Sequence, residues 1–376
     1  MTAYLDNSAT TPVSPEARQA MLRAADECWG NPSSRHALGL EAESLLEGTR
    51  AAIAERLAAE PEELVFTSGG TEANNLAVLG GAAAMRRRGC RVVTSAVEHP
   101  SVYEAAAHLE KLGYDVVYLP ADKHGCIREG ELRKAITAST ILVSVMWVNN
   151  ETGARQPVEL IKPLLHAVRS PALLHVDAVQ AFGKLPVRPA EIDADLLTVS
   201  AHKIHGPKGA GALYIRKGVR VLPRAYGGSQ EGKIRPGTEA LPLIAGFGAA
   251  AENLPDLDEA LAKVSALRDR LAEGLAELGG IVINSPEDTL PHILNFSVPG
   301  QKSEPMLNFL SERGVYISSG SACSKGKPSR VLKAMGLPPR LLESALRVSF
   351  SHRNTAGEAD MLLEALAEAR RTLIGA

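Results

Sequence analysis

Cysteine is scarce in this chain of 376 residues, and its four copies are scattered. Cys28, Cys90, Cys126 and Cys323 form no CxxC pair. Structural zinc sites and disulfide frameworks need cysteines at short, repeated spacings, so we expect neither here. Isolated free thiols are typical of a reducing compartment, and we therefore expect the protein to be cytoplasmic.

Strong charge and long hydrophobic runs are also lacking. The formal net charge of −2 argues against nucleic-acid binding through bulk charge. The longest apolar stretch, 241–251, is too short and too rich in glycine to span a membrane. No basic, apolar and small-residue progression follows Met1, so we expect no signal peptide. Hydrophobic residues still make up 45% of the chain, which is enough for a substantial core.

What the sequence does contain is an alternation of strand and helix patterns. Short apolar runs read as strands, and segments with helical spacing of apolar residues separate them. The strand runs are 63–67, 91–95, 115–119, 141–148, 173–176 and the run that begins at Leu196. This alternation predicts an α/β fold with a large, mostly parallel sheet and helices on both faces. Strand runs at 281–284, 293–298 and 345–350 predict a second, smaller α+β domain.

Lys203 follows the strand run that begins at Leu196 and precedes a Gly206-Pro207 turn. Open α/β sheets place their chemistry at the carboxyl ends of their strands. A lysine at this position either stays a solvated amine or forms a Schiff base with a carbonyl cofactor. This stretch alone does not decide between the two, and a solvated surface lysine is the commoner case.

Polar groups follow other strand runs as well. Gly70 and Thr71 come after the run 63–67, where glycines and a helix start can cradle a phosphate. This segment is neither a Walker loop nor a Rossmann GxGxxG fingerprint, and it can also be a simple turn. His99 follows the run 91–95. It can stack on a planar ring or transfer protons, or it can be a turn histidine bonded to the backbone.

Three more polar side chains lie at predicted strand ends. Asn149 can donate to a carboxylate or a phenolic oxygen, or it can form an Asx turn. Asp177 needs a partner such as a cationic ring nitrogen, although a helix N-cap role also accounts for it. Gln180 lies three residues further on and shares its face if a helix begins here. A phosphate cradle, an acid for a pyridinium nitrogen and a lysine are what pyridoxal phosphate requires, so we interpret Lys203 as its binding lysine.

The segment 318–323, with the sequence SSGSAC, places a cysteine among small polar residues. Lys325 and Lys327 favour the thiolate, which is the nucleophilic form. We therefore interpret Cys323 as a functional thiol, against the alternative of an incidental surface thiol. Arg347 is a charge within an apolar strand run and needs an anionic partner. That partner is a substrate α-carboxylate or the carboxylate of a structural ion pair.

These residues lie in motifs that resemble those of the NifS/IscS-like cysteine desulfurases, which are class-V aminotransferases of fold type I that use pyridoxal phosphate. The resemblance runs along nearly the whole chain, with the motifs in the right order. The matching segments are 5–12, 30–34, 67–75, 148–153, 175–180, 200–203, 235–239 and 318–323. The cysteine motif resembles that of the members with a long cysteine loop, although the loop after Cys323 is a couple of residues shorter than is common there.

The resemblance implies a fold-type I architecture. We expect a large cofactor-binding domain at 15–255, and a small domain that is formed by 1–14 and 256–376 and carries the cysteine loop. Lys203 would form the Schiff base, His99 would stack on the cofactor ring, and Asp177 would pair with the ring nitrogen. The other implied cofactor contacts are Gly70, Thr71, Asn149, Gln180, Ser200, His202 and, from the other subunit of a homodimer, Thr238.

The implied reaction converts L-cysteine to L-alanine and leaves the sulfur as a persulfide on Cys323. Asn149 and Arg347 would bind the substrate carboxylate, and His99 would handle a proton on the substrate thiol or on the product. The sulfur would pass to an acceptor protein for iron–sulfur cluster assembly or for tRNA or cofactor thiolation. We expect no metal site of the chain's own, although Cys323 could share an iron–sulfur cluster with a partner. Direct nucleic-acid and membrane partners are not expected.

Three alternatives stay open. The first is a selenocysteine lyase or another pyridoxal-phosphate lyase on the same fold. The second is an interaction module that docks sulfur acceptors with little turnover, which intact Lys203, Asp177 and Cys323 argue against. The third is a dinucleotide-binding dehydrogenase, which the missing GxGxxG motif disfavours.

Overall fold

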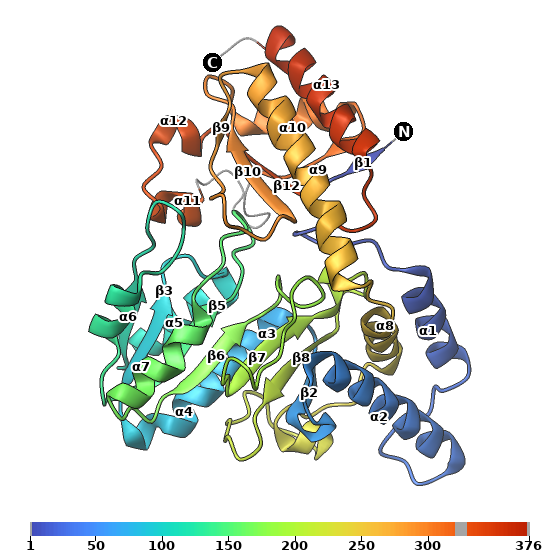
Figure 1. Cartoon of the computed structure of the whole chain (residues 1–376). Coiled ribbons are helices and arrows are strands. Elements are labelled where there is room, and N and C mark those ends of the chain that lie inside the picture. The colour runs from blue at the N-terminus through green and yellow to red at the C-terminus, as the bar shows by residue number, and fades with distance from the viewer. Residues whose placement is uncertain (1, 320–328, 374–376) are drawn as a thin grey trace.

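The computed structural model describes residues 2–319 and 329–373 of the chain, so Cys323 lies outside the described residues. A large lower part is built around a broad sheet, and a smaller upper part is built around β10 (Figure 1). The N-terminal strand lies in the upper part, and the chain then enters the lower part at α1 (Figure 1).

A seven-stranded sheet forms the centre of the large part, in the order β2-β8-β7-β6-β5-β3-β4. Its strands are β2 (Leu64–Thr67), β3 (Arg91–Ser95), β4 (Asp115–Leu119), β5 (Thr140–Met146), β6 (Leu173–Asp177), β7 (Leu196–Ser200) and β8 (Gly211–Ile215). Strand β8 pairs antiparallel with both of its neighbours, and the remaining pairs are parallel. The prediction of a mostly parallel sheet is therefore confirmed.

Apolar residues of the strands alternate between the two faces of this sheet, as the period of a strand requires. Val93, Val143 and Leu174 belong to a core on one face. The helices of that core are α1 (Pro15–Asp26), α2 (Ala37–Leu57), α6 (Glu129–Ala135), α7 (Ile161–Ala167) and α8 (Leu241–Glu252). Their sequence neighbours Val92, Leu142 and Leu173 belong to the core on the other face. Its helices are α3 (Gly70–Asn75), α4 (Gly81–Met85), the π-helical segment Leu76–Gly80 between them, and α5 (Pro100–Lys111).

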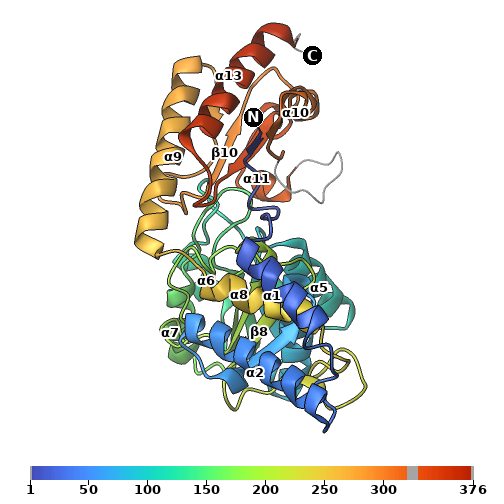
Figure 2. The same cartoon turned by 90° about the vertical axis from the view of Figure 1, so that its right-hand side faces the viewer.

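The small part has its own core around β10 (Ile293–Ser297), which lies between β9 (Val282–Ile283) and β12 (Ala345–Ser349). Figure 2 shows α9 (Leu257–Leu278) and α13 (Ala356–Thr372) side by side against this sheet, with α10 (Ser303–Glu312) nearby. The N-terminal β1 (Ala3–Tyr4) pairs with β11 (Val315–Tyr316) and joins the same core. The short helices α11 (Arg330–Ala334) and α12 (Pro339–Leu342) follow the undescribed segment 320–328.

The link between the two parts runs from the end of α8 at Glu252 to the start of α9 at Leu257. The domain boundary expected at residue 255 falls in this link and remains a prediction. No helix in the described part of the chain is both long enough and apolar enough to cross a membrane.

Candidate active site

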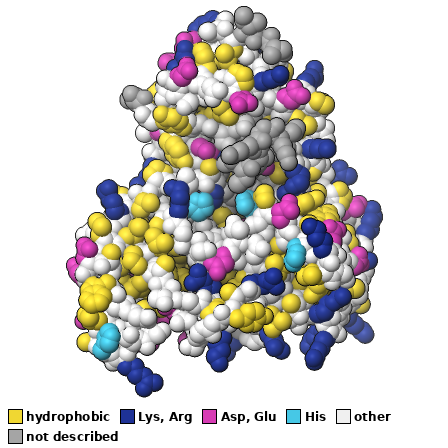
Figure 3. All heavy atoms as spheres, turned by 180° about the vertical axis from the view of Figure 1, so that it is seen from behind, with side chains coloured by type: hydrophobic (Ala, Val, Ile, Leu, Met, Phe, Trp, Pro, Cys, Tyr) yellow, Lys and Arg dark blue, Asp and Glu magenta, His cyan; other side chains and the backbone are white. Residues whose placement is uncertain are grey.

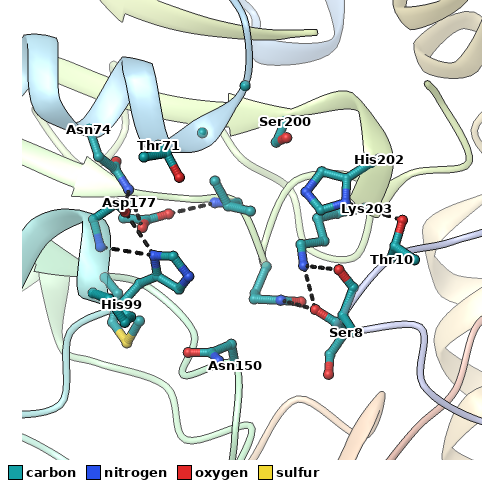
Figure 4. A pocket seen from close by; sticks show the side chains of 18 of the residues that line it. Ser8, Thr10, Thr71, Asn74, His99, Asn150, Asp177, Ser200, His202 and Lys203 are labelled. Atoms are coloured by element: carbon teal, nitrogen blue, oxygen red, sulfur yellow. Dashed lines mark hydrogen bonds between the residues drawn. The ribbon is translucent and has the colours of Figure 1, made fainter. Parts of the chain in front are cut away.

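A pocket of about 540 Å³ opens at the carboxyl ends of the sheet strands. Most of the site residues predicted from the sequence line it, namely Gly70, Thr71, His99, Asp177, Gln180, Ser200, His202, Lys203 and Arg347. Asp177 and His99 lie on one side of the pocket, and His202 and Lys203 lie on the other (Figure 4). The fold therefore brings strand ends that are far apart in the sequence to one place, as parallel strands of one sheet must.

Ser68 and Gly69 form the turn between β2 and α3, and Gly70 is the first residue of α3. Gly69 has a φ of 144°, in the region that favours glycine. A Cβ atom on Gly70 would lie 2.9 Å from Cγ2 of Val179, so glycine permits a close approach that a larger residue would disturb. The first N–H groups of α3 have no carbonyl partner in the helix and lie beside Thr71. This arrangement suits an anion such as a phosphate.

Ser200 and His202 offer two further polar groups to the pocket. The hydroxyl of Ser200 is buried and has no hydrogen-bond partner among the described residues. Nδ1 of His202 lies 3.2 Å from Oγ1 of Thr10. Burial, with nearby cations, lowers the pKa of His202 to about 3, so its ring is neutral at neutral pH. Both groups can bond a phosphate oxygen without adding charge.

Asp177 is only 5% exposed, and both of its carboxylate oxygens have donors. Oδ2 accepts from Nδ2 of Asn74 at 2.7 Å, and Oδ1 accepts from the backbone N–H of Val179 at 3.0 Å. Both donors are neutral amides, and no arginine or lysine among the described residues forms an ion pair with this carboxylate. A buried carboxylate of this kind is suited to hold a cationic ring nitrogen.

His99 is the N-cap of α5. Its Nδ1 accepts from the backbone N–H of Ser101 at 3.2 Å and lies 2.7 Å from Oγ of the same residue. Burial lowers the pKa of His99, while the charge of Asp177 opposes that shift. The neutral form of the ring is therefore favoured. The turn histidine bonded to the backbone is observed, and because the ring also lines the pocket, its stacking on a cofactor or its transfer of protons stays a prediction.

Lys203 projects from the segment after β7 into the pocket. Its Nζ donates to the carbonyl oxygens of Ser8 at 2.5 Å and of Ala9 at 2.7 Å. Burial is the main cause that lowers its pKa to about 7, and the charges of Lys184 and Arg347 add to it. In a large fraction of the molecules the Lys203 side chain is therefore a neutral amine near pH 7. The neutral amine is the form that attacks an aldehyde.

Gln180 is fixed by two hydrogen bonds. Its Oε1 accepts from Nζ of Lys184 at 3.0 Å, and its Nε2 donates to the carbonyl of Ser8 at 2.9 Å. Burial lowers the pKa of Lys184 to about 8. The carbonyl of Ser8 also accepts from Nζ of Lys203. Gln180 and Lys203 are therefore held by the same acceptor.

Arg347 lies on β12 and is 1% exposed. Nη2 pairs with Oδ1 of Asp6 at 2.7 Å, and Nη1 donates to the carbonyl of Asn150 at 3.0 Å. Its Nε is buried and has no partner among the described residues. The structural ion pair is present, and because Arg347 also lines the pocket, its binding of a substrate carboxylate stays a prediction.

Asn149 requires a correction, because its side chain does not line the pocket. It is fully buried, and Oδ1 accepts from the backbone N–H groups of Glu151 and Thr152 in an Asx turn. Nδ2 is engaged with the carbonyl of Val97 and with the sulfur of Met146. The next residue, Asn150, lines the pocket instead. The turn after β5 buries the first asparagine of the pair and turns the second one toward the site.

Thr238 is a second predicted residue that does not line this pocket. Thr238 is exposed and lies on the segment that follows Ser229, outside the pocket lining. That segment is tied to the body of the protein where Glu231 pairs with Arg50 at 2.8 Å and Arg235 pairs with Glu72 at 3.0 Å. Cys323 lies outside the described residues.

Pyridoxal phosphate fits the groups that this pocket presents. Lys203 offers an amine for the aldehyde, and Asp177 offers a buried carboxylate for the ring nitrogen. The glycine turn before α3 and the unpartnered hydroxyl of Ser200 offer donors for the phosphate. These are the groups by which proteins orient and tune this cofactor.

Asn74 and Ser101 also line the pocket, and the sequence analysis assigned them no role. Asn74 donates to Asp177 and to Ser101, and Ser101 bonds His99. A sequence signal existed for Asn74, because it lies in the polar helix start that follows the glycine turn. Ser101 resembles an ordinary first-turn helix residue, so its contact with His99 required the structure.

Comparisons with known proteins agree with this geometry. The Aminotransferase class-V family model matches residues 3–362. The protein named cysteine desulfurase IscS from Methanosarcina thermophila is 42% identical over 369 residues, which is 97% of this chain and 91% of that protein. A solved structure named as a NifS-like protein superposes with a TM-score of 0.94 at 37% identity, over 99% of this chain and 100% of that one. The structure of SspA in complex with cysteine superposes with a TM-score of 0.83 at 33% identity, over 94% of this chain and 100% of that one.

Proposed function

This chain belongs to the class-V aminotransferase family and is a pyridoxal-phosphate-dependent cysteine desulfurase, and we propose that its pocket converts L-cysteine to L-alanine with the sulfur left on Cys323. The resemblance seen in the sequence is confirmed by these relatives. The observation that carries the site assignment is the placement of the Lys203 amine and the Asp177 carboxylate on opposite sides of one pocket.

Several side chains would hold the cofactor. Lys203 would bind its aldehyde, Asp177 its ring nitrogen, and Gln180 its phenolic oxygen. The phosphate would lie between the glycine turn at Gly70, Thr71, Ser200 and His202. When bound, the cofactor supplies an electron sink that lets the substrate lose its Cα proton and weakens its C–S bond.

The residues of the chain would then position the substrate and move its protons. Arg347 and Asn150 lie at the pocket wall, where the guanidinium group and an amide can bind the substrate carboxylate. The lowered pKa of Lys203 supports a role in moving the Cα proton, because the neutral amine can accept it near pH 7.

Cys323 would take the sulfur. Its thiolate forms a bond to the substrate sulfur while the substrate C–S bond breaks, and the carbon skeleton gains a proton to become alanine. The persulfide would pass to an acceptor protein, for iron–sulfur cluster assembly or for tRNA or cofactor thiolation. We also propose a cytoplasmic setting, because a thiolate nucleophile must stay reduced between turnovers.

The direct test is product formation by the purified, cofactor-loaded protein. With L-cysteine as substrate, the wild type should release alanine in an amount equal to the sulfur recovered with a thiol acceptor. The Lys203→Ala variant should release none, although it should remain folded. A wild type that forms no alanine from L-cysteine would contradict the proposed activity.

We further propose that the enzyme is a homodimer in which Thr238 reaches the phosphate of the other subunit's cofactor. The support is the exposure of Thr238 on a segment anchored by the pair Glu231–Arg50. Large apolar side chains are also exposed, namely Leu22, Trp29 and Leu40 on or between α1 and α2, and Tyr226 just before that segment. Figure 3 shows hydrophobic side chains gathered on the flank of the lower part where α1 and α2 lie. Patches of this kind mark protein interfaces.

Subunit mixing tests the shared site. Homodimers of Lys203→Ala lack the binding lysine, and homodimers of Thr238→Ala should bind cofactor weakly. In a mixed dimer one site carries both substitutions and the other carries neither, so each mixed dimer should have about half of the activity of a wild-type dimer. A monomer by light scattering, or no recovery on mixing, would contradict the proposal.

A further inference from the structure

Four side chains form a hydrogen-bonded row along one side of the pocket. Asp177 Oδ2 accepts from Asn74 Nδ2 at 2.7 Å, and Asn74 Nδ2 also lies 2.9 Å from Ser101 Oγ. Ser101 Oγ lies 2.7 Å from His99 Nδ1. The row joins β6, α3 and the start of α5, and all four residues line the pocket (Figure 4).

The direction of each hydrogen bond in this row follows from the Asp177 carboxylate, which can only accept. The carboxylate of Asp177 accepts, so the amide of Asn74 must present its NH₂ group to it rather than its oxygen. The second hydrogen of that NH₂ group goes to Ser101, so the hydroxyl oxygen of Ser101 accepts there. The hydroxyl hydrogen is then left to donate to Nδ1 of His99.

A second donor acts on the same atom of His99. The backbone N–H of Ser101 lies 3.2 Å from Nδ1 and can only donate. Nδ1 therefore faces two donors and carries no hydrogen in the neutral ring. In that tautomer the ring hydrogen sits on Nε2. Figure 4 shows the ring with its other nitrogen turned away from these bonds and toward the pocket.

We infer that Asn74 and Ser101 are positioning residues that lock His99 in the Nε2–H tautomer, so that it offers the reaction a hydrogen-bond donor and not a general base. This inference rests on the proposed function of the pocket. A neutral imidazole of this tautomer can take up a proton only at Nδ1, where two donors already point. It revises the expectation that His99 accepts a proton from the substrate thiol, and it leaves Lys203 as the base of the site.

The charged groups around His99 do not reverse this conclusion. Asp177 is the acid that favours protonation of the ring, while Lys203 and Arg330 oppose it. Glu98, the residue next to His99, is buried, and burial raises its pKa to about 8, so it is largely uncharged at pH 7. Burial of the ring itself also favours the neutral form and lowers the pKa of His99.

The test is to read the protonation of each ring nitrogen by ¹⁵N NMR on protein labelled at histidine, with a His99→Gln variant to assign the signals. In the wild type, with and without cofactor, we expect a bare Nδ1 and a protonated Nε2 at pH 7 and above. Asn74→Asp replaces the donor by an acceptor, which lets Ser101 donate to residue 74 and accept from Nδ1–H. It should raise the titration midpoint of His99 by about one to three pH units.

Two further variants separate the effect of the hydrogen-bonded row on His99 from the effect of any substitution nearby. Ser101→Ala removes one of the two donors to Nδ1 but keeps the backbone N–H, so the tautomer should stay and the midpoint should rise by less than in Asn74→Asp. Asn75→Ala is the matched control, because Asn75 bonds the carbonyls of Thr71 and Ser101 and none of the side chains in the row. Its titration should equal that of the wild type.

A wild-type ring with a hydrogen on Nδ1, or an unchanged midpoint in Asn74→Asp, would overturn the inference. Kinetics add a second readout, since His99→Gln keeps a side-chain N–H donor but no base. It should retain more kcat than His99→Phe, by about tenfold or more. An active desulfurase with the other tautomer would refute this inference alone, whereas the expected tautomer in a protein that makes no alanine would refute the proposed function alone.

Discussion

Arg347 Nη2 donates to Oδ1 of Asp6 at 2.7 Å, and this ion pair ties β12 to the N-terminal segment at the wall of the pocket. The pair leaves Nε of Arg347 buried and without a partner among the described residues. The guanidinium group is therefore held in place by Asp6 while part of its hydrogen-bonding capacity remains for another anion.

Replacement of the guanidinium group should weaken substrate binding. We expect Arg347→Gln to raise KM for L-cysteine by about 10- to 100-fold, because a hydrogen bond to a charged group contributes about 1.5–3 kcal/mol. Asp6→Asn is the matched control, since the amide oxygen still accepts from Nη2, and its KM should change by less than about tenfold. Steady-state kinetics with saturating cofactor measure both values. An Arg347→Gln enzyme with wild-type KM would remove Arg347 from substrate binding.

The neighbours Asn149 and Asn150 should respond in opposite ways to truncation. Asn149 is buried with both ends of its amide bonded, so Asn149→Ala should lower the free energy of unfolding by about 1–3 kcal/mol. Asn150 lines the pocket, so Asn150→Ala should reduce kcat/KM with little effect on stability. Urea unfolding and kinetics on the two variants provide the comparison. The reverse pattern would return the site role to Asn149.

This pair also marks where sequence reasoning reaches its limit. The strand ends were predictable because β5 and β6 are mostly apolar, and parallel strands bring their carboxyl ends to one edge. Lys203 and Asp177 follow from that rule. Which of two adjacent asparagines faces the pocket depends on the Asx turn after β5, and a turn is set by contacts that lie outside the local pattern.

Other elements depended on long-range packing. Helix α6 was not expected, because its seven residues are mostly charged and polar and only Leu132 and Ala135 are buried. The ion pair between Asp6 and Arg347 joins residues at opposite ends of the chain, and a backbone bridge between Asp6 and Ser349 brings the two segments together. The role proposed for Thr238 requires a second subunit, so a single chain does not test it.

The lowered pKa of Lys203 predicts how the cofactor-free protein captures pyridoxal phosphate as the pH changes. The neutral amine is the reactive form, and a pKa of about 7 means that its fraction rises as the pH increases through 7. The capture rate should therefore rise between about pH 6 and pH 8 and then level off. Stopped-flow absorbance of the bound cofactor measures this profile. A rate that keeps rising up to about pH 10, the range of an ordinary lysine, would contradict the lowered pKa.

Lys184 should act on Lys203 through its charge. The positive charge of Lys184 is one cause of the lowered pKa of Lys203, and its amine also holds Gln180. Lys184→Met should therefore shift the midpoint of the capture profile to higher pH. Lys208→Met serves as the control, because Lys208 also lines the pocket but is exposed at its edge. Equal midpoints in Lys184→Met and the wild type would show that the charge of Lys184 is not felt at Lys203.

The identity of the sulfur acceptor on the enzyme is the central claim of this account, and mass spectrometry tests it most directly. After a brief reaction with L-cysteine, the peptide that contains Cys323 should carry the mass of one additional sulfur atom, and Cys323→Ala should form no persulfide and release no alanine. Cys126→Ala is the matched control, because burial and nearby acids raise the pKa of the Cys126 thiol to about 11 and keep it protonated. It should behave as the wild type. Sulfur on Cys126, or full alanine release by Cys323→Ala, would contradict the account.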